Sequence, residues 1–241
     1  MRIAIVSDLH SELPNVKLFQ GCDALIVNGD LCPDWNLPVL QVSIKQIAWL
    51  ENNFNSWIQK CGFDRNHVFV IPGNHDISFQ ENLSEVKTVL HGRTIINESF
   101  ELGSAKFWGT PYTFKPPHYG KHWAFGLSEE SLWDNYCMIP PSTDYVCSHQ
   151  PPKCGLSVGF NGRGEMCDFG SESFRRFLIE KSKDYNFKEI YTAHTHENGG
   201  LSFRWTYLDH AGFKKHTTLR SVCLIDDSFC TNRTPYILEV A

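Results

Sequence analysis

Short apolar runs alternate with longer amphipathic stretches along this chain. The runs predict buried strands at Arg2–Val6, Ala24–Val27, Val68–Ile71, Tyr145–Cys147 and Ile190–Thr192, and a final strand at Pro235–Val240. Apolar residues near a 3.6-residue period predict a helix at Val39–Ile58, and further helices are predicted at Phe79–Leu90 and Ser171–Lys181. This alternation of strands and helices is typical of the α/β class.

Two turn-rich stretches, Gly109–Pro141 and Gln150–Gly170, interrupt the pattern and predict long loops, which are often functional in compact domains. The aromatic side chains between residues 107 and 136 are Phe107, Trp108, Tyr112, Phe114, Tyr119, Trp123, Phe125, Trp133 and Tyr136. Such rings could stack on a substrate, but we expect most of them to pack the loop onto the core. Tyr112 and Trp123 are the candidates for a pocket. Lys153 and Arg163 are candidates to approach a phosphate, although lone basic side chains are usually solvated.

Composition and charge narrow the class of protein. The 241 residues show no linker or repeat, so we predict a single domain over residues 1–241. The net charge of −5 argues against a long nucleic acid partner, which calls for a basic face. No apolar stretch approaches the roughly 20 residues of a membrane span, so no membrane partner is expected. The nine cysteines include no C-x-x-C pair, and the first residues carry no signal-peptide pattern, which predicts a cytoplasmic protein.

Side chains of metal-ligand type follow each of the five predicted internal strands. They are Asp8 and His10 after the first, Asp30 after the second, Asn74 after the third, His149 after the fourth, and His194 and His196 after the fifth. Open α/β sheets bind ligands at the carboxyl ends of their strands. We therefore expect the five strands to end side by side and these side chains to meet.

The donor types indicate which metals could bind. Carboxylate, imidazole and amide oxygen without thiolate favour Mn²⁺, Fe, Zn²⁺ or Mg²⁺. The set is too large for one catalytic ion with an open position, and it suits two divalent metal ions per chain that share a bridging carboxylate. Gly29 and Gly73 directly precede ligand candidates, where a turn needs positive φ or close backbone approach.

The ordered motifs Asp-x-His, Gly-Asp, Gly-Asn-His-Asp, His and His-x-His, which span Asp8–His196, resemble those of the calcineurin-like metallophosphoesterase superfamily. Later segments are similar to its metallophosphodiesterase-domain (MPPED-type) branch, namely Phe107–Pro111, Ile139–Pro141, Asp144–Pro152, Ser221–Cys223 and Asn232–Val240. The superfamily resemblance implies a four-layer α-β-β-α sandwich, in which two mixed sheets are flanked by helices.

The resemblance also implies residue roles. The implied ligands are Asp8, His10 and His196 for one ion and Asn74, His149 and His194 for the other, with Asp30 bridging. His75 would meet the phosphate and assist the leaving group. An acidic residue orients that histidine in the family, and Asp76 and Asp34 are both candidates. Ala193 and Gln150 stand where the family has glycine, but neither change removes a ligand.

The first functional interpretation is a dinuclear phosphodiesterase that hydrolyses small phosphodiesters, such as cyclic nucleotides, by a metal-bridging hydroxide. The second is a small-molecule phosphomonoesterase. Protein phosphatases of the superfamily follow the bridging aspartate with an Asp-Arg-Gly turn, whereas Leu31–Trp35 contains no arginine. The third is a non-catalytic metal-binding scaffold, which the loss of a ligand would mark. The physiological substrate, the native metal pair and the oligomeric state are not specified by the sequence.

Overall fold

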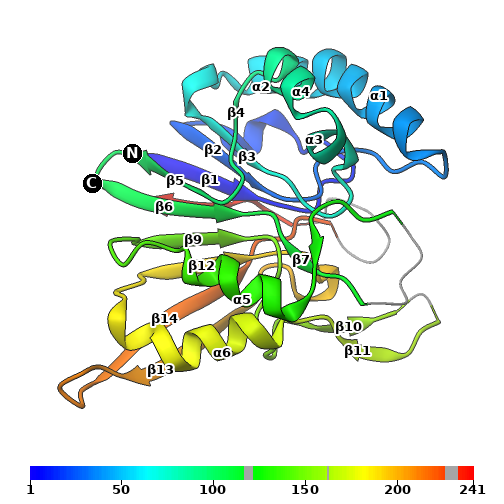
Figure 1. Ribbon diagram of the computed structural model, residues 1–241. Coiled ribbons are helices and arrows are strands. Elements are labelled where there is room, and N and C mark those ends of the chain that lie inside the picture. The colour runs from blue at the N-terminus through cyan, green and yellow to red at the C-terminus, as the bar shows by residue number, and fades with distance from the viewer. Residues whose placement is uncertain (117–121, 162, 226–232) are drawn as a thin grey trace.

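The computed structural model describes residues 1–116, 122–161, 163–225 and 233–241, and its strands form two large sheets that lie face to face (Figure 1). The first sheet has the order β15 (Tyr236–Glu239), β1 (Arg2–Val6), β2 (Ala24–Asn28), β3 (Val68–Ile71) and β4 (Arg93–Thr94). The second has the order β13 (Ser202–Leu208), β14 (Lys214–Ser221), β12 (Glu189–Thr192), β9 (Tyr145–Ser148), β6 (Ala105–Thr110) and β5 (Glu98–Leu102). Inner strands pair in parallel, whereas β15, β13 and β5 pair antiparallel with their neighbours, so both sheets are mixed.

Helices cover the outer face of each sheet (Figure 1). The first sheet carries α1 (Val39–Trp49), α2 (Asn55–Cys61), α3 (Ile77–Glu81) and α4 (Leu83–Val89), and the second carries α5 (Glu129–Cys137) and α6 (Glu172–Lys181). Two small pairs of strands complete the described structure, β7 (Thr113–Phe114) with β8 (Gly126–Leu127), and β10 (Val158–Phe160) with β11 (Met166–Asp168). Short 3-10 segments lie at Val16–Phe19, Arg65–His67, Ser182–Asp184 and His196–Asn198. The predicted four-layer α-β-β-α sandwich is confirmed.

Local departures from the predicted elements have local causes. The predicted Val39–Ile58 helix is interrupted by a π-helical segment at Leu50–Phe54. The predicted Phe79–Leu90 helix is two helices, because Asn82 leaves helical geometry (φ −137°, ψ 47°) and its side chain donates a hydrogen bond to Ser43 Oγ at 2.6 Å. The predicted long loops contain α5, whose first turn is capped by Ser128, and the β10–β11 hairpin.

The five strands that precede the predicted ligands are divided between the two sheets. β1, β2 and β3 belong to the first sheet, whereas β9 and β12 belong to the second. Asn28, the last residue of β2, donates hydrogen bonds from its side chain to Ser148 O at 3.2 Å and Tyr191 O at 3.3 Å in the second sheet. The carboxyl ends therefore meet across the sandwich instead of along a single sheet edge.

Aromatic rings fill the space between the two sheets. Phe107 is fully buried and stacks with Phe100 at 5.1 Å and with Tyr145 at 4.9 Å between ring centroids. Phe100 in turn stacks with Phe69 of the first sheet at 4.6 Å. Offset ring stacking adds to the free energy gained from burying these large side chains, so this ladder anchors one sheet to the other.

The two ends of the chain meet in the first sheet (Figure 1). β15 pairs with β1, and the amino group of Met1 donates to Val240 O at 2.8 Å. The last strand therefore pairs with the first strand in the same sheet.

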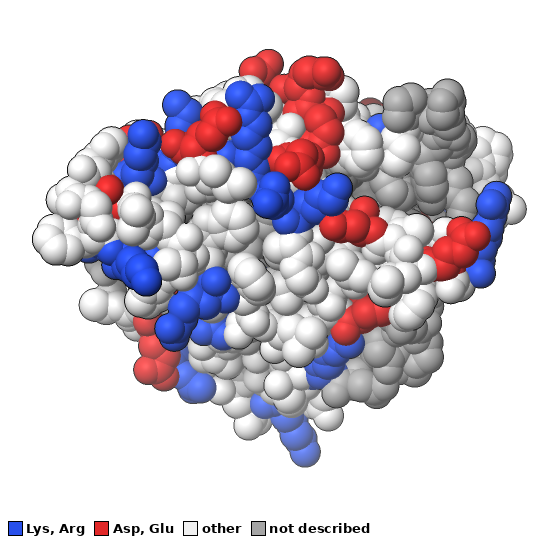
Figure 2. Space-filling view, turned by 90° about the horizontal axis from the view of Figure 1, so that it is seen from below, with Lys and Arg blue, Asp and Glu red and all other residues white. Residues whose placement is uncertain are grey.

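Charged side chains of both signs alternate on the face in Figure 2, which views the molecule from the side of α6. On α6, Arg175 and Arg176 pair with Glu172 at 3.1 Å and Glu180 at 2.7 Å, respectively. Among the described residues of this face, basic and acidic side chains are interspersed instead of forming the continuous basic stripe that a nucleic acid backbone calls for. Within the described ranges, none of the helices combines the length and the apolar character needed to cross a membrane.

The aromatic ladder yields a stability prediction. Phe107→Ala should lower the free energy of unfolding by about 3–5 kcal/mol, because it removes a buried ring from between two stacked neighbours and leaves a cavity. Urea denaturation measures the change. Phe213→Ala removes a ring that is 69% exposed and should change stability by no more than about 0.5 kcal/mol. Equal losses in both variants would contradict the prediction.

Candidate functional site

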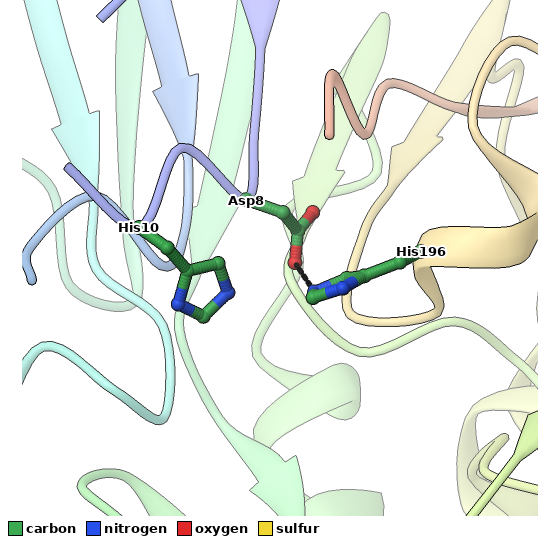
Figure 3. Close-up of side chains that lie close together, drawn as sticks. All are labelled: Asp8, His10 and His196. Carbon is green, nitrogen blue, oxygen red and sulfur yellow. Dashed lines mark ion pairs between the residues drawn. The ribbon is translucent and has the colours of Figure 1, made fainter. Parts of the chain in front are cut away.

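Loops from both sheets assemble the first predicted ligand set. Asp8 and His10 follow β1, and His196 follows β12 of the other sheet. Figure 3 shows the Asp8 carboxylate directed at the His196 ring, with Asp8 Oδ1 at 3.5 Å from His196 Nε2. One ligand atom from each of the three residues can be chosen so that all lie within 4.8 Å of one another.

The second set lies beside the first, and Asp30 stands between them. Ligand atoms of Asp30, His149 and His194 also lie within 4.8 Å of one another, and Asn74 Oδ1 is 3.0 Å from His149 Nε2. Asp30 Oδ2 lies 3.1 Å from His149 Nε2 and 3.8 Å from His10 Nε2. The structure thus brings all seven predicted ligands together, and Asp30 lies between the two sets. Which atoms bind metal stays a prediction.

The donor chemistry around His149 fits a cation. Its Nδ1 lies 3.0 Å from the carbonyl oxygen of Asn28, which can only accept, so Nδ1 carries the proton. In the neutral ring Nε2 then presents a lone pair towards Asp30 Oδ2 and Asn74 Oδ1, which are themselves lone-pair donors. Three such atoms converge favourably only around a positive charge, either a proton or a metal ion.

Electrostatics in the cluster follow from the buried Asp30 carboxylate. Burial raises the pKa of Asp30, but the positive charges of His149 and His75 and the hydrogen bond with His149 bring it well below its usual value. Burial lowers the pKa of His149, yet the Asp30 charge raises it to about 9 overall. Burial and repulsion from His149 lower the pKa of His194 to about 3, which leaves that imidazole neutral. The neutral His194 and the ionised Asp30 are in the protonation states that bind metals, whereas His149 would release its proton when a metal binds.

Four of the predicted ligands sit on strained backbone. Asp8, His10, Asp30 and His194 have φ values of 52°, 41°, 51° and 71°, in the left-handed region. Such conformations cost on the order of 1–3 kcal/mol each and cluster at functional sites. Backbone hydrogen bonds hold two of the turns, because Asp8 N donates to Gly29 O and His10 N to Asp30 O, both at 2.9 Å.

Two glycines make room for the cluster, as expected. Gly29 has φ +101°, and a Cβ there would lie 2.0 Å from His149 Nδ1. Gly73 has no positive φ, but a Cβ on it would lie 2.3 Å from Asp30 Oδ1. Close backbone approach requires glycine at both positions, and Gly29 also needs the conformational freedom.

Asp34, not Asp76, contacts the ring of His75. Asp34 Oδ1 lies 2.8 Å from His75 Nδ1, and its other oxygen lies 3.1 Å from His10 Nδ1. Burial lowers the pKa of His75, but the Asp30 charge and the Asp34 hydrogen bond raise it to about 9. Ligand atoms of His10, Asp34 and His75 form a third compact group, so the geometry alone permits His75 as a ligand as well.

The Asp76 carboxylate does not contact the His75 ring but joins, through hydrogen bonds, the two loops that carry Asp30 and His75. Its carboxylate accepts hydrogen bonds from Gly73 N at 2.8 Å, Cys32 N at 2.8 Å and Leu31 N at 3.1 Å. All three donors are backbone groups, and the carboxylate is fully buried. Asp76 is therefore a positioning residue for the cluster.

The sequence did not reveal several residues that hold the cluster in place. The carbonyl of Asn28 fixes the ring of His149. Gln46 on α1 donates to His75 O at 2.8 Å, and the guanidinium of Arg233 donates to His196 O at 2.6 Å. Of these residues, only Gln46 gave a signal in the sequence. It is a polar residue on the apolar face of the predicted Val39–Ile58 helix, which indicates a buried polar contact. Gln150, noted as a departure, ties the loops together, since it accepts from Phe114 N at 2.8 Å and donates to Phe169 O at 2.6 Å.

A pocket of ≈ 540 Å³ adjoins His75 and Asp34, and Trp123 lines it as expected. Tyr112 instead packs edge-on against Phe125 at 5.9 Å and does not line this pocket.

Tyr119 and Asn232 lie outside the described residues. The other rings of the 107–136 stretch are buried or packed against the core clusters, namely Phe107, Trp108, Phe114, Phe125, Trp133 and Tyr136. Lys153 pairs with Glu172 at 3.9 Å, and Arg163 is exposed.

Comparison with known proteins places this geometry in a family. The model of the family described as calcineurin-like phosphoesterase matches residues 1–198. A solved structure without a descriptive name superposes with a TM-score of 0.56 at 14% identity, over 89% of this chain and 97% of the other. The 5′-nucleotidase precursor from Thermus thermophilus superposes with a TM-score of 0.50 at 12% identity, over 92% of this chain and 48% of the other. At these identities, the likeness shows the fold.

A curated relative is much longer than this chain. The chain is 28% identical over 174 residues to the probable rhamnogalacturonate lyase C of Emericella nidulans. The match covers 67% of this chain but 15% of that protein. The name of that protein therefore carries no activity over to this chain.

The contrast between the two aspartates near His75 is testable. Asp76→Asn should lower the free energy of unfolding of chelator-treated protein by about 1–3 kcal/mol, because an amide N–H₂ would face buried backbone donors. Asp34→Asn should cost less than about 1 kcal/mol, because the side chain of Asp34 is 49% exposed. Urea denaturation of both variants gives the comparison, and a larger loss for Asp34→Asn would contradict the assignment.

Proposed function

Because the chain belongs to the calcineurin-like phosphoesterase family, we propose that it is a dinuclear metal-dependent phosphodiesterase that hydrolyses small phosphodiesters, such as cyclic nucleotides. Members of this family are metal-dependent hydrolases. The observation that carries the proposal is the position of Asp30, whose Oδ2 faces His149 at 3.1 Å and His10 at 3.8 Å. It lies between the two ligand sets, as a bridging carboxylate would.

The metal ligands are proposed to divide as the family resemblance implies. Asp8, His10 and His196 hold one divalent ion, Asn74, His149 and His194 hold the other, and Asp30 is shared. Mn²⁺, Fe, Zn²⁺ and Mg²⁺ all suit these donors. Such a pair of ions supplies positive charge to the phosphoryl oxygens and lowers the pKa of water at the site.

The chain's own residues then handle the leaving group. His75 lines the pocket, and Asp34 contacts its Nδ1, so Nε2 is the ring nitrogen available to a substrate. The carboxylates of Asp30 and Asp34 raise the pKa of His75, which favours the protonated ring. Nε2–H is therefore suited to donate to the departing ester oxygen. The backbone N–H of His75 donates to Asp30 Oδ1 at 2.8 Å, which fixes the donor relative to the bridge.

The distribution of cations favours a diester over a monoester. A monoester dianion is usually gripped by an arginine, and the segment Leu31–Trp35 after Asp30 has none. Among the described residues that line the pocket beside His75, none is Lys or Arg. The similarity of the later segments to the MPPED-type branch supports the same substrate class. We also propose a cytoplasmic location, which the free state of the cysteines among the described residues supports.

The role of His75 predicts a loss of rate without a loss of metal. His75→Ala should lower kcat by roughly 10²–10⁴-fold, since it removes the general acid and no ligand. Elemental analysis of the variant should give the metal content of the wild type. His216→Ala, a change at an exposed histidine on β14, serves as the control and should keep full activity. A variant that loses an ion would mean that His75 is a ligand.

Substrate class is tested by comparing two esters of one aryl alcohol. The value of kcat/KM should be higher for the bis-aryl phosphate than for the aryl monophosphate, under one metal and one pH, because that ratio reports transition-state binding. A preference of about tenfold or more for the monoester would establish the phosphomonoesterase alternative. Failure to cleave either ester with both ions bound would favour the scaffold.

A further inference from the structure

The pocket beside His75 is walled by apolar side chains. Its apolar lining consists of Trp35, Leu37, Val39, Val42, Ile77 and Trp123. The pocket volume of ≈ 540 Å³ falls within the roughly 300–1,000 Å³ of small-molecule sites. None of these six residues is among the predicted ligands, so the pocket is a separate feature that opens beside the metal cluster.

Packing against the core holds this wall in place. Val42 of α1 and Ile77 of α3 are buried, at 6% and 7% exposure, and form the inner part of the lining. Trp35 and Leu37, from the segment between β2 and α1, pack against the core cluster that contains Val42 and Ile77. A wall supported in this way is largely formed before a ligand arrives, which lowers the entropic cost of binding.

The two indoles of the pocket are each held by a named partner. The Lys45 ammonium lies over the Trp35 ring, 5.4 Å from its centroid, and Lys45 does not line the pocket. The Trp123 ring packs edge-on against His194, 5.6 Å between centroids. Trp123 therefore joins the pocket directly to the second ligand set. Indoles in such a position offer faces on which planar rings stack.

The side chains that line the pocket favour an uncharged occupant. Asp34 is its one carboxylate among the described lining residues, and Lys and Arg are missing from that lining. Asp34 Oδ1 lies 2.8 Å from His75 Nδ1, so these two lining groups are paired with each other. The remaining wall is mainly apolar, which favours an uncharged ring as the occupant.

We propose that this pocket binds the leaving group of the substrate and selects an uncharged, planar, ring-bearing alcohol, either an aryl alcohol or a nucleoside. This inference rests on the proposed phosphoesterase function. His75 and Asp34 line the same pocket, so a ring held there places its ester oxygen beside the proposed proton donor. Trp35 is the specificity-determining residue, and it acts by contact with the ring of the leaving group.

Binding of the free leaving group tests the pocket without requiring catalysis. Isothermal titration of metal-free protein should detect phenol and adenosine, and it should detect glycerol and ribose far more weakly. Trp35→Ala should weaken binding of the aromatic probes on the order of tenfold, whereas Trp35→Phe should keep most of it. Trp133→Ala removes an indole outside the pocket and should leave binding unchanged. Tighter binding of adenosine than of phenol would assign the pocket to nucleosides, and the reverse order would assign it to aryl alcohols.

Measurements of kcat/KM on two diesters distinguish a wrong pocket assignment from a wrong proposed function. With metal bound, Trp35→Ala should lower kcat/KM for an aryl methyl phosphodiester by a similar factor and leave that for dimethyl phosphate unchanged. If the wild type cleaves both esters and Trp35→Ala affects them equally, the pocket assignment is overturned while the phosphoesterase function stands. If no ester is cleaved but the aromatic probes still bind in a Trp35-dependent way, the proposed function fails and the ring-binding pocket stands. If the probes do not bind, the pocket assignment is wrong.

Discussion

The buried carboxylate of Asp30 is the constraint on which the rest of the site depends. It is 1% exposed and lies where loops from the two sheets meet, so leaving it without a compensating charge would cost several kcal/mol. His149 and His10 face one of its oxygens, and the backbone N–H of His75 donates to the other. The carboxylate of Asp30 is thus surrounded by a backbone hydrogen-bond donor and by side chains of metal-ligand type. The cation-binding character of the site follows from this one charge.

The backbone of the loops around Asp30 is adapted to its buried carboxylate. Gly29 and Gly73 flank Asp30 and His149 so closely that a methyl group at either position would overlap them. Asp30 itself is in the left-handed region, and Asp76 fastens the loop after β2 to the loop after β3 through backbone hydrogen bonds. The aromatic ladder around Phe107 offsets the free-energy cost of these strained loops, because its stacked rings hold the two sheets together.

Much of the fold and nearly all of the cluster could be predicted from the sequence, because buried strands leave continuous apolar runs and the ligands directly follow them. β13 was not predicted although Phe203, Trp205 and Tyr207 alternate with polar residues along it, because its side chains are mostly exposed and form no continuous apolar run. The break at Asn82 depends on a contact with Ser43 of α1. The family resemblance implied two mixed sheets, but which strands belong to each is known only from the structure, since strand order is not encoded in local pattern. From the sequence, both Asp34 and Asp76 were candidates to orient His75, because only tertiary structure decides which carboxylate faces an imidazole. Trp35 gave no signal, since a lone indole in a loop is consistent with packing alone.

The central claim is that Asp30 bridges two metal ions, and anomalous diffraction from crystals of Mn²⁺-loaded protein tests it most directly. The account predicts two peaks about 3.5–4 Å apart, one beside Asp8, His10 and His196 and the other beside Asn74, His149 and His194, with Asp30 in contact with both. Asp30→Ala should abolish at least one of them. A single peak, or a peak held by His10, Asp34 and His75 in the third group of ligand atoms, would contradict the account.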